Sequence, residues 1–444
     1  MIPTFMNVPP WIDAWLGLTP YSIRGSNDSA MSSAAQPRLL LLVPTTTYRT
    51  EDFVEAARRL DVDLVVAAER PNTLAAALPD HLLTLPFKDP AAAAALMRDY
   101  ARTRPIAAVV PVDDETTVVG AAIGQALGLR ANALSAVSAT RNKQTMREAL
   151  ARAGVRQPGF AVYPVTDDPQ AVAAGARFPC VLKPLVLSAS RGVIRADTRA
   201  EFAAAWTRIA AILGDPDVRA LGDGATKILV EDFVPGVEVS LEGMLTEDAL
   251  ATLAIFDKPD PLDGPFFEET IYVTPSRLPE ATQRAVAASA GQAARALGLS
   301  DGPLHVELRI NEAGPWLIEL AARSIGGLCS RTLSFGTGMS LEEIILRHAL
   351  GWPIASLERE LPAAGVMMIP IPRGGVLEEV RGLDAARAVA GIEDVTISIP
   401  KGHTVVPLPE GSRYLGFIFS RAATPAEAEA SLRRAHALLE FKIR

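Results

Sequence analysis

Two short apolar runs flank a turn in the segment LHVELRINEAGPWLIELAARSIGG, residues 304–327. The turn formers Asn311-Glu312-Ala313-Gly314-Pro315 between them predict a β-hairpin. If the hairpin closes symmetrically about Ala313, Glu307 and Glu319 lie opposite each other on one face of a sheet. Like charges in such a cross-strand pair repel. A chain with this hairpin must therefore neutralise or separate two carboxylates.

Burying two carboxylates together costs several kcal/mol unless a cation neutralises them. A bound cation, an acid/base pair that shares a proton, and simple exposure to solvent are the three explanations. Exposure of both Glu307 and Glu319 to solvent is not expected, because their neighbours on the two strands are apolar. These neighbours are Val306, Leu308, Leu317, Ile318 and Leu320. Carboxylate and phosphate oxygens are the ligands that Mg²⁺ prefers, so we favour a metal site at Glu307 and Glu319. His305 shares the Glu307 face and is either a third ligand or, as we favour, a core residue.

The length of 444 residues predicts several domains rather than one core. A net charge of −8 argues against a nucleic-acid binder. No apolar run approaches the roughly 18 residues of a membrane span, so we predict a cytoplasmic protein. The two cysteines, Cys180 and Cys329, are too few for a disulfide framework and are expected in the core.

The chain divides into a tail and three structured regions. Residues 1–37 are linker-like at their end and receive no role. Apolar strand patterns alternate with helical patterns over 38–136, which predicts a doubly wound α/β layer. From 137 to 361 helices and strands mix without strict alternation, as in an α+β unit. Residues 362–444 have strand-like runs followed by an amphipathic helix and are predicted to form a further small α+β domain.

A phosphate site is indicated by FPCVLKPLVLSASRG, residues 178–192. Lys183 ends an apolar strand, and the small residues Ser188 to Gly192 allow backbone N–H groups to approach phosphate oxygens. Lys183 and Arg191 supply positive charge, although a lysine in such a place is more often a solvated surface residue. No GxxxxGK[ST] and no GxGxxG after the first strand is present.

Three further charged residues, two acidic and one basic, are candidates for contacts with a nucleotide or a substrate. Glu231 and Glu238 in ILVEDFVPGVEVSLEG either face water or border a purine and its ribose. Arg323 follows Glu319 by four residues, and the next residues, SIGG, permit close backbone approach. A guanidinium at that place suits a phosphate or carboxylate.

Taken in order, four segments resemble the ATP-grasp superfamily: NKQTMREALARAGVRQP, FPCVLKPLVLSASRGV, ILVEDFVPGVEVSLEG and LHVELRINEAGPWLIELAARSIGG. The ending IELAARSIGG, with FFEETIYVTPSRLP upstream, is similar to carboxylate–amine ligases of the L-amino-acid ligase type. The resemblance covers about 38–444. It implies an N-terminal pre-ATP-grasp domain over 38–136, an ATP-grasp domain over 137–361 with a mobile lid at about 178–240, and a C-terminal domain over 362–444.

The resemblance also implies residue roles. Arg323, Lys183 and Arg191 would act on the reacting groups, and Glu307 and Glu319 would hold Mg²⁺, with Mn²⁺ as an alternative. The remaining ATP contacts would come from Lys143, Ser188, Ser190, Glu231, Asp232, Phe233, Val234 and Glu238. The substrate pocket would be formed by Glu269, Tyr272, Arg323, Gly326 and Gly327.

The implied activity is ATP-dependent joining of a small-molecule carboxylate to an amine through an acyl phosphate, with release of ADP and phosphate. A homodimer is one option that the resemblance leaves open. Ala321 stands where the wider superfamily usually has Asn, and Tyr272 where relatives often have His. Two alternatives remain: an ATP-grasp enzyme of nucleotide metabolism, and a non-catalytic ATP-binding regulatory protein.

Overall fold

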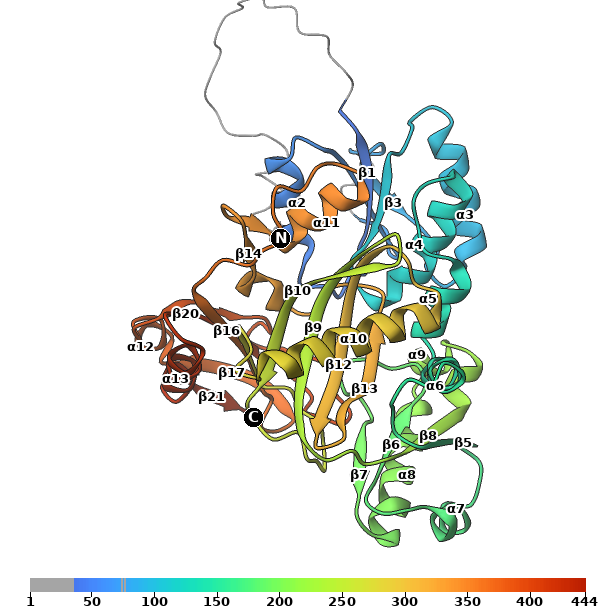
Figure 1. Ribbon diagram of the computed structural model, residues 1–444, viewed down its shortest axis with the longest axis vertical. Helices are drawn as coiled ribbons and strands as arrows, with labels where there is room; N and C mark the ends of the chain where they lie inside the picture. Colours follow the sequence, from blue (N-terminus) through green and yellow to red (C-terminus); the bar gives the residue numbers. More distant parts are fainter. Residues whose placement is uncertain (1–35, 73–74, 76) are drawn as a thin grey trace, which may run out of the picture.

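The computed structural model describes residues 36–72, 75 and 77–444, so the predicted tail lies outside the described residues except for Gln36 and Pro37. Figure 1 shows an N-terminal α/β layer, a large central sheet and a smaller sheet, with the C-terminal segment beside the central sheet. Among the described residues, none of the helices combines the length and hydropathy needed to span a membrane.

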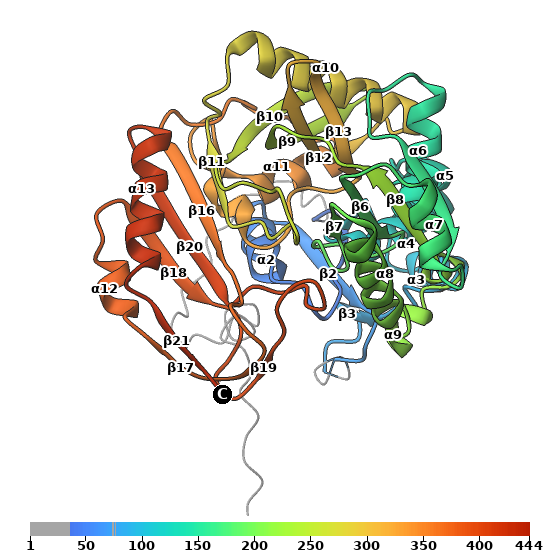
Figure 2. The same ribbon diagram turned by 90° about the horizontal axis from the view of Figure 1, so that it is seen from below.

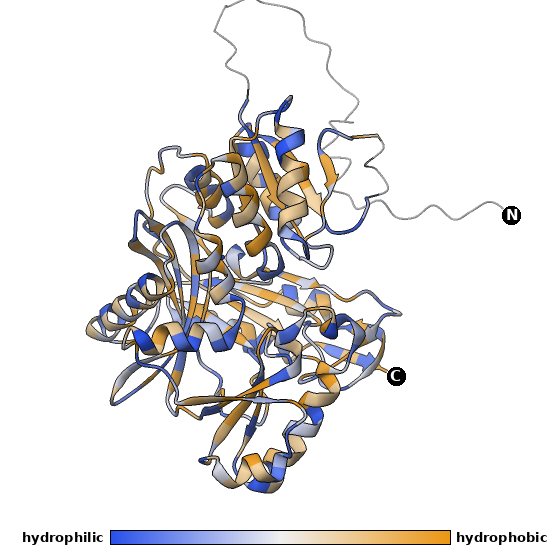
Figure 3. Ribbon diagram, turned by 90° about the vertical axis from the view of Figure 1, so that its right-hand side faces the viewer, coloured by the Kyte–Doolittle hydropathy of each residue, from blue (hydrophilic) through white to orange (hydrophobic). Residues whose placement is uncertain are grey.

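The predicted α/β layer is present as a parallel sheet in the order β3-β2-β1-β4. Leu39 and Leu41 of its central strand pack into one cluster, while Leu40 and Leu42 pack into another. Both faces of the strand are therefore covered, which explains its unbroken apolar run; Figure 3 shows these strands in hydrophobic colours. The elements are β1 (Arg38–Leu42), α2 (Thr50–Arg59), β2 (Asp63–Ala68), β3 (Leu82–Thr84), α3 (Pro90–Ala101), β4 (Ala108–Pro111) and α4 (Asp114–Leu127).

The segment before the next sheet forms two helices rather than one: α5 (Leu134–Thr140) and α6 (Lys143–Arg152). The break falls at Asn142, whose side chain accepts hydrogen bonds from the amides of Gln144 and Thr145. Asparagine is a preferred N-cap because its side chain satisfies amides that a helix leaves unpaired. The cap makes Lys143 the first residue of α6.

A small antiparallel sheet in the order β5-β8-β6-β7 occupies the region predicted to contain the lid. It spans 160–232 rather than about 178–240, because β5 joins it from earlier in the chain and the strand after 236 belongs to the central sheet. We call residues 160–232 the lid sheet. Its elements are β5 (Phe160–Pro164), α7 (Pro169–Gly175), β6 (Cys180–Pro184), β7 (Ile194–Ala196), α8 (Arg199–Leu213), α9 (Pro216–Arg219), a 3₁₀ turn (Asp223–Thr226) and β8 (Lys227–Asp232).

The central sheet is antiparallel throughout and runs β13-β12-β9-β10-β11-β16-β20-β18. Its last three strands come from the predicted C-terminal domain, so the boundary at 361 crosses a continuous sheet (Figure 2). The elements are β9 (Val237–Thr246), β10 (Ala249–Lys258), β11 (Ile271–Thr274), α10 (Glu280–Leu297), β12 (Gly302–Asn311), β13 (Gly314–Ala321), β16 (Ala363–Ile369), β18 (Ile392–Ile397) and β20 (Gly416–Ala422).

The rest of the C-terminal region forms a second small sheet in the order β19-β17-β21. The amphipathic helix predicted for this region is confirmed, and the residues after it form a further strand. The elements are β17 (Gly375–Arg381), α12 (Leu383–Arg387), β19 (Thr404–Val405), α13 (Pro425–His436) and β21 (Glu440–Ile443).

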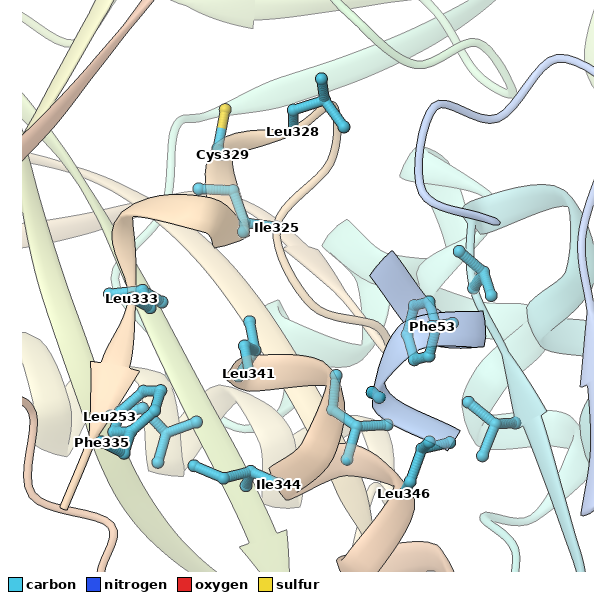
Figure 4. Packing of buried hydrophobic residues seen from close by; sticks show 14 of the residues in the cluster. Phe53, Leu253, Ile325, Leu328, Cys329, Leu333, Phe335, Leu341, Ile344 and Leu346 are labelled. Carbon is cyan, nitrogen blue, oxygen red and sulfur yellow. The ribbon is translucent and has the colours of Figure 1, made fainter. Parts of the chain in front are cut away.

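Helix α11 (Leu341–Ala349) joins the N-terminal layer to the central sheet. Figure 4 shows its apolar residues gathered with Phe53 of α2 and Leu253 of β10 in one buried cluster. The short segments before it are a 3₁₀ turn (Cys329–Thr332), β14 (Ser334–Phe335) and β15 (Met339–Ser340). Because one core spans both layers, the loops between them are held in fixed relative positions.

Candidate active site

The hairpin places Glu307 opposite Glu319, as predicted, but through a different geometry. The tight turn pairs Asn311 with Gly314, so it is centred between Glu312 and Ala313. A β-bulge then inserts Ile318 as an extra residue and shifts the register by one. Arg147 of α6 donates to the carbonyl oxygens of Leu317 (3.2 Å) and Ile318 (2.6 Å), which holds the bulge in place.

Along β9, β12 and β13, one face of the central sheet carries charged side chains and the other is aliphatic. On β9, Val239 and Leu241 point into a core cluster that includes residues of α10, while Glu238, Ser240 and Glu242 point to the opposite face. The neighbouring strands follow the same period of two. The charged face carries Glu238, Glu242, Lys258, Tyr272, His305, Glu307, Arg309 and Glu319.

Lys258, at the end of β10, connects three acidic side chains on this face. Its ammonium lies 2.8 Å from Glu238 and 3.2 Å from Glu307 and also contacts Glu269. Burial alone would lower the pKa of Lys258, but these carboxylates hold it well above its ordinary value. The three carboxylates each place an oxygen within 4.8 Å of the others. The cation at the centre of this cluster is therefore the lysine.

Glu269 and Tyr272, predicted to line the substrate pocket, are hydrogen-bonded to each other. The Tyr272 hydroxyl donates to Glu269 at 2.7 Å. Burial raises the pKa of Glu269 to about 7, against the opposing effect of the Lys258 ammonium. Glu269 can consequently exist with or without a proton near neutral pH, and as a carboxylate it can accept hydrogen bonds from a cationic amino group.

His305 is a buried residue with two acidic neighbours. Its Nδ1 contacts Glu242, and its Nε2 lies 3.5 Å from Glu307. Burial disfavours the charged ring, but the carboxylate of Glu242 raises the pKa of His305 to about 9. The histidine is therefore cationic at neutral pH, which suits the favoured interpretation as a partnered core residue rather than a metal ligand.

The two opposed glutamates each have their own ammonium partner. Lys143 lies 3.2 Å from Glu319, and Lys258 lies 3.2 Å from Glu307. Lysines thus already supply positive charge to both carboxylates, so a divalent cation is not the only neutralising group at this pair. The donor set still fits Mg²⁺, since two carboxylates opposed in register both line the cavity described below. The metal site stays a prediction.

Lys183 and Glu231 form a buried ion-pair network with Arg147. Arg147 lies 2.6 Å from one Glu231 oxygen, and Lys183 lies 2.8 Å from the other. Burial favours the protonated acid, but Arg147 and Lys183 together lower the pKa of Glu231 to about 2. The side chain of Glu231 therefore fixes Lys183 beside the cavity and, through Arg147, ties the lid sheet to the bulged hairpin.

The predicted phosphate loop has an unusual backbone. Ala189 and Ser190 both adopt left-handed conformations, with φ of 53° and 54°. Such strain in residues other than glycine concentrates at ligand-binding loops. Gly192 is also left-handed, and a Cβ there would lie 2.7 Å from the ring of Pro184. Ser188 and Ser190 line the cavity.

Arg191 does not line the cavity with the rest of this loop. Its guanidinium donates to the Glu410 carbonyl oxygen at 2.8 Å and pairs with Asp215 at 2.7 Å. The structure therefore does not bring Arg191 together with the other predicted site residues. It instead joins the loop to the C-terminal region.

Arg323 pairs with a residue of the N-terminal layer. Its guanidinium lies 2.7 Å from Asp114, at the start of α4, and it donates to the Ser324 carbonyl at 2.8 Å. Although burial opposes the charged form, Asp114 raises the pKa of Arg323 further. The guanidinium remains in the cavity lining, where Asp114 fixes its direction.

A cavity of about 430 Å³ unites these groups. Of the predicted site residues, those that line it are Lys143, Lys183, Ser188, Ser190, Glu231, Asp232, Phe233, Val234, Glu238, Glu269, Tyr272, Glu307, Glu319, Arg323, Gly326 and Gly327. Gly327 also has a packing role, because a Cβ there would lie 3.0 Å from the Phe417 ring.

Sequence reasoning missed Lys258, Glu242 as the partner of His305, Arg309 and the loop Ser412–Tyr414. Lys258 had a visible signal, since it ends an apolar strand as Lys183 does. Its partner was hidden because a bulge between Thr252 and Ala254 shifts the register of β9 and β10 by one, which brings Lys258 opposite Glu238.

Three family models match the chain. They are an ATP-grasp N-terminal domain over 54–129, an ATP-grasp domain over 176–332 and the L-amino acid ligase C-terminal domain 2 over 367–444. The chain is similar to the uncharacterized protein y4rH of Sinorhizobium fredii, with 26% identity over 413 residues that cover 91% of this chain and 83% of that protein.

Two of the similar proteins illustrate the activities found among them. Alanine–anticapsin ligase of Bacillus subtilis is 28% identical over 235 residues, which cover 50% of this chain and 49% of that ligase. The chain thus spans about half the length of that relative. The crystal structure of an L-amino acid ligase from Bacillus licheniformis has 25% identity and a TM-score of 0.75, covering 92% of this chain and 99% of that one.

Proposed function

This chain belongs to the ATP-grasp superfamily and carries the C-terminal domain of L-amino acid ligases, and we propose that it joins an amino acid to an amine substrate with ATP. The observation that carries the proposal is one cavity lined both by the lid-sheet lysine and serines expected to contact phosphate and by Glu269 and Arg323 on the substrate side. The expected class of enzyme, an ATP-dependent C–N ligase, agrees with the ligases that the chain is similar to.

The reaction has two balanced steps. A carboxylate oxygen of the acid attacks the γ-phosphorus of ATP, the bond to the bridging oxygen breaks, and ADP leaves. The amine nitrogen then attacks the acyl carbon, phosphate departs with the electron pair of the C–O bond, and the nitrogen loses a proton. Such chemistry depends on positioning and charge neutralisation more than on covalent help from the protein.

The residues divide this work by location. Lys143 and Lys183 would bind phosphate oxygens, and the loop Ser188–Ser190 would cover them and exclude water from the acyl phosphate. Glu307 and Glu319 would hold Mg²⁺, which supplies positive charge beside the phosphates. Arg323, held by Asp114, would orient the phosphorylated carboxylate and stabilise the oxyanion formed by amine attack.

Glu269 supports the choice of an amino acid as the acid substrate. It is an acidic group in the cavity wall, and its Tyr272 and Lys258 contacts fix its position. An α-amino group on the substrate would be bound there as a cation. A homodimer and the binding of adenine by the backbone of residues 231–234 stay predictions.

The test is an ADP-release screen of the full chain over carboxylates, alone and in pairs with amines. We expect ADP and phosphate to form in equal amounts only when an amino acid and an amine are both present. An enzyme of nucleotide metabolism would share the ATP-facing residues, so ribonucleotide amines belong in the same screen. If ADP is released with ribonucleotide amines and with no other amine, an enzyme of nucleotide metabolism would replace the proposal. If none of the pairs leads to ADP release, a regulatory protein would be favoured.

A further inference from the structure

Arg49 is a fully buried arginine that the function proposed above does not use. It lies just before helix α2 in the N-terminal layer. Its Nη1 donates to the Ser324 hydroxyl at 2.7 Å and to the Ile325 carbonyl oxygen at 3.0 Å. Both acceptors belong to residues 323–327, and all residues of this segment except Ser324 line the cavity. Arg49 therefore holds part of the cavity wall without belonging to it.

Two other contacts fix the position of the Arg49 guanidinium. Its Nη2 lies 2.8 Å from a carboxylate oxygen of Glu342 on α11, which is also buried, and its central carbon lies 5.0 Å from the centroid of the Phe53 ring. Phe53 and Ile325 belong to one apolar cluster (Figure 4). Burial favours the protonated acid, but Arg49 lowers the pKa of Glu342. A buried ion pair adds little net stability compared with apolar packing, and its better attested use is to specify one arrangement.

The peptide groups on both sides of Ile325 are hydrogen-bonded to buried charged side chains. The Ile325 amide donates to Glu242 of β9 at 2.9 Å, and its carbonyl oxygen accepts from Arg49. Close packing does not hold the next residue, Gly326, because a Cβ built there would have no heavy atom within 4 Å beyond its chain neighbours. The backbone at this part of the cavity wall therefore takes its position from the contacts of Ser324 and Ile325.

We infer that Arg49 is a positioning residue for amide formation, because it holds residues 323–327 where Arg323 and the backbone after it meet the reacting groups. This inference rests on the proposed function and deepens it by giving the N-terminal layer a part in the chemical step. Moving a group at a reacting centre by about 1 Å can lower the rate on the order of 100-fold. Loss of the Arg49 contacts should consequently lower kcat. The KM for ATP should change little, because ATP binding is assigned to Lys143 and the lid sheet.

The first experiment compares the wild type with Arg49→Lys. Lysine keeps a positive charge beside Glu342, but its single nitrogen cannot occupy the positions of both Nη1 and Nη2. We expect kcat for amide formation to fall roughly 10- to 100-fold, with the KM for ATP within about twofold of the wild-type value. Arg331→Lys is the matched control, since Arg331 joins the same two parts of the chain through Asp52 at 2.9 Å and is 32% exposed. Its kcat should stay within about twofold of wild type.

Ser324→Ala removes one contact of Arg49 and leaves the pair with Glu342 in place. We expect kcat to fall roughly three- to tenfold at an unchanged melting temperature. The double variant should be no slower than Arg49→Lys alone, because both changes act through the same contact. If Arg49→Lys does not fold, Ser324→Ala decides the question by itself. A wild-type kcat in Ser324→Ala, or fully additive losses in the double variant, would overturn the inference.

Hydrogen exchange of the full chain tests the same contacts without turnover. The amides of Ile325 and Gly326 should exchange roughly five- to tenfold faster in Arg49→Lys and Ser324→Ala than in the wild type, and at the wild-type rate in Arg331→Lys. Unchanged exchange in the first two variants, or equal losses of kcat in Arg49→Lys and Arg331→Lys, would overturn the inference. Faster exchange in a wild-type background that shows no ligation would count against the proposed function alone.

Discussion

Lys258 shows how a buried charge cluster can serve a binding site. Its ammonium contacts three carboxylates that come from β9, β12 and the segment before β11. The same Nζ lies over the Tyr272 ring, 5.0 Å from the centroid. An isolated buried carboxylate is costly, whereas one that shares a fixed cation is not. The lysine thereby fixes three acidic side chains of the cavity wall before any ligand binds.

Glu319→Gln tests the predicted metal site at the scale of one atom. The change keeps the shape but removes the charge, so we expect amino-acid-dependent ADP release to fall on the order of 100-fold. The fold should persist because the Glu319 side chain is 35% exposed, and a melting curve checks this. Glu312→Gln, an exposed carboxylate in the turn of the same hairpin, is the control. Turnover near the wild-type rate in Glu319→Gln would remove Glu319 from the metal site.

Glu231→Gln tests the buried network with Arg147 and Lys183. Removing one partner of a buried ion pair should destabilise the protein by about 3–5 kcal/mol, measured as a lower urea midpoint at pH 7. The pKa of Glu231 is lowered from 4.5 to about 2 on folding. Its contribution is therefore complete above pH 4.5 and is lost as the pH falls toward 2.

The difference between wild type and Glu231→Gln should accordingly shrink between pH 4.5 and 2. Glu280→Gln is the control, because Glu280 is 86% exposed and its pair with Arg284 is solvated. A constant difference across this pH range would contradict the assignment.

At the scale of elements, one loop joins the lid sheet to the C-terminal region. Pro409 accepts from the Gly192 amide at 2.9 Å, and the Glu410 carbonyl accepts from Arg191 at 2.8 Å. The Glu410 carboxylate pairs with Arg208 of α8 through two contacts, one of 2.8 Å. The same loop continues into Ser412 and Arg413, so the lid sheet and the cavity-lining residues Ser412–Tyr414 are mechanically connected.

Glu410→Gln should loosen this connection only modestly. The Arg208 and Glu410 side chains are 43% and 40% exposed, and solvated ion pairs contribute about 0–1 kcal/mol. We expect a two- to fivefold rise in the KM for ATP (about 0.4–1 kcal/mol). Trypsin should also cleave the lid sheet faster.

Glu393→Gln breaks a similarly exposed pair with Arg421 away from the lid sheet and serves as its control. If Glu410→Gln and Glu393→Gln have the same KM for ATP and the same rate of trypsin cleavage, the Glu410 contact does not stabilise the position of the lid sheet.

At the scale of the whole molecule, the C-terminal region is structurally part of the central sheet. Strand β11 is paired with β16 along the full length of β11, and Ile271 and Val273 of β11 are buried against C-terminal residues. A chain that ends at residue 361 would expose an unpaired strand edge with apolar side chains, which favours aggregation.

We therefore expect residues 36–361 to elute as aggregates in size-exclusion chromatography with light scattering, whereas the full chain remains dispersed. A monomeric fragment with a cooperative melting transition would show that the regions are independent.

Local patterns in the sequence were enough to predict most helices and strands and to identify the family. The hairpin pairs Glu307 with Glu319, and both cysteines are buried as expected. Apolar periodicity and capping residues act over a few neighbouring positions, so they can be interpreted without the tertiary structure. The ordered series of ATP-grasp segments identified the superfamily for the same reason.

Only the tertiary structure decided which charges meet. Two bulges shift the registers of β9–β10 and β12–β13 by one residue, and a shift of one moves every side chain to the other face. The partners of Glu231, Arg191 and Arg323 come from segments distant in the chain. The sequence alone determined the elements and the acidic character of the site. Folding decided that lysines neutralise the acids, because ion pairing depends on distances that no local pattern encodes.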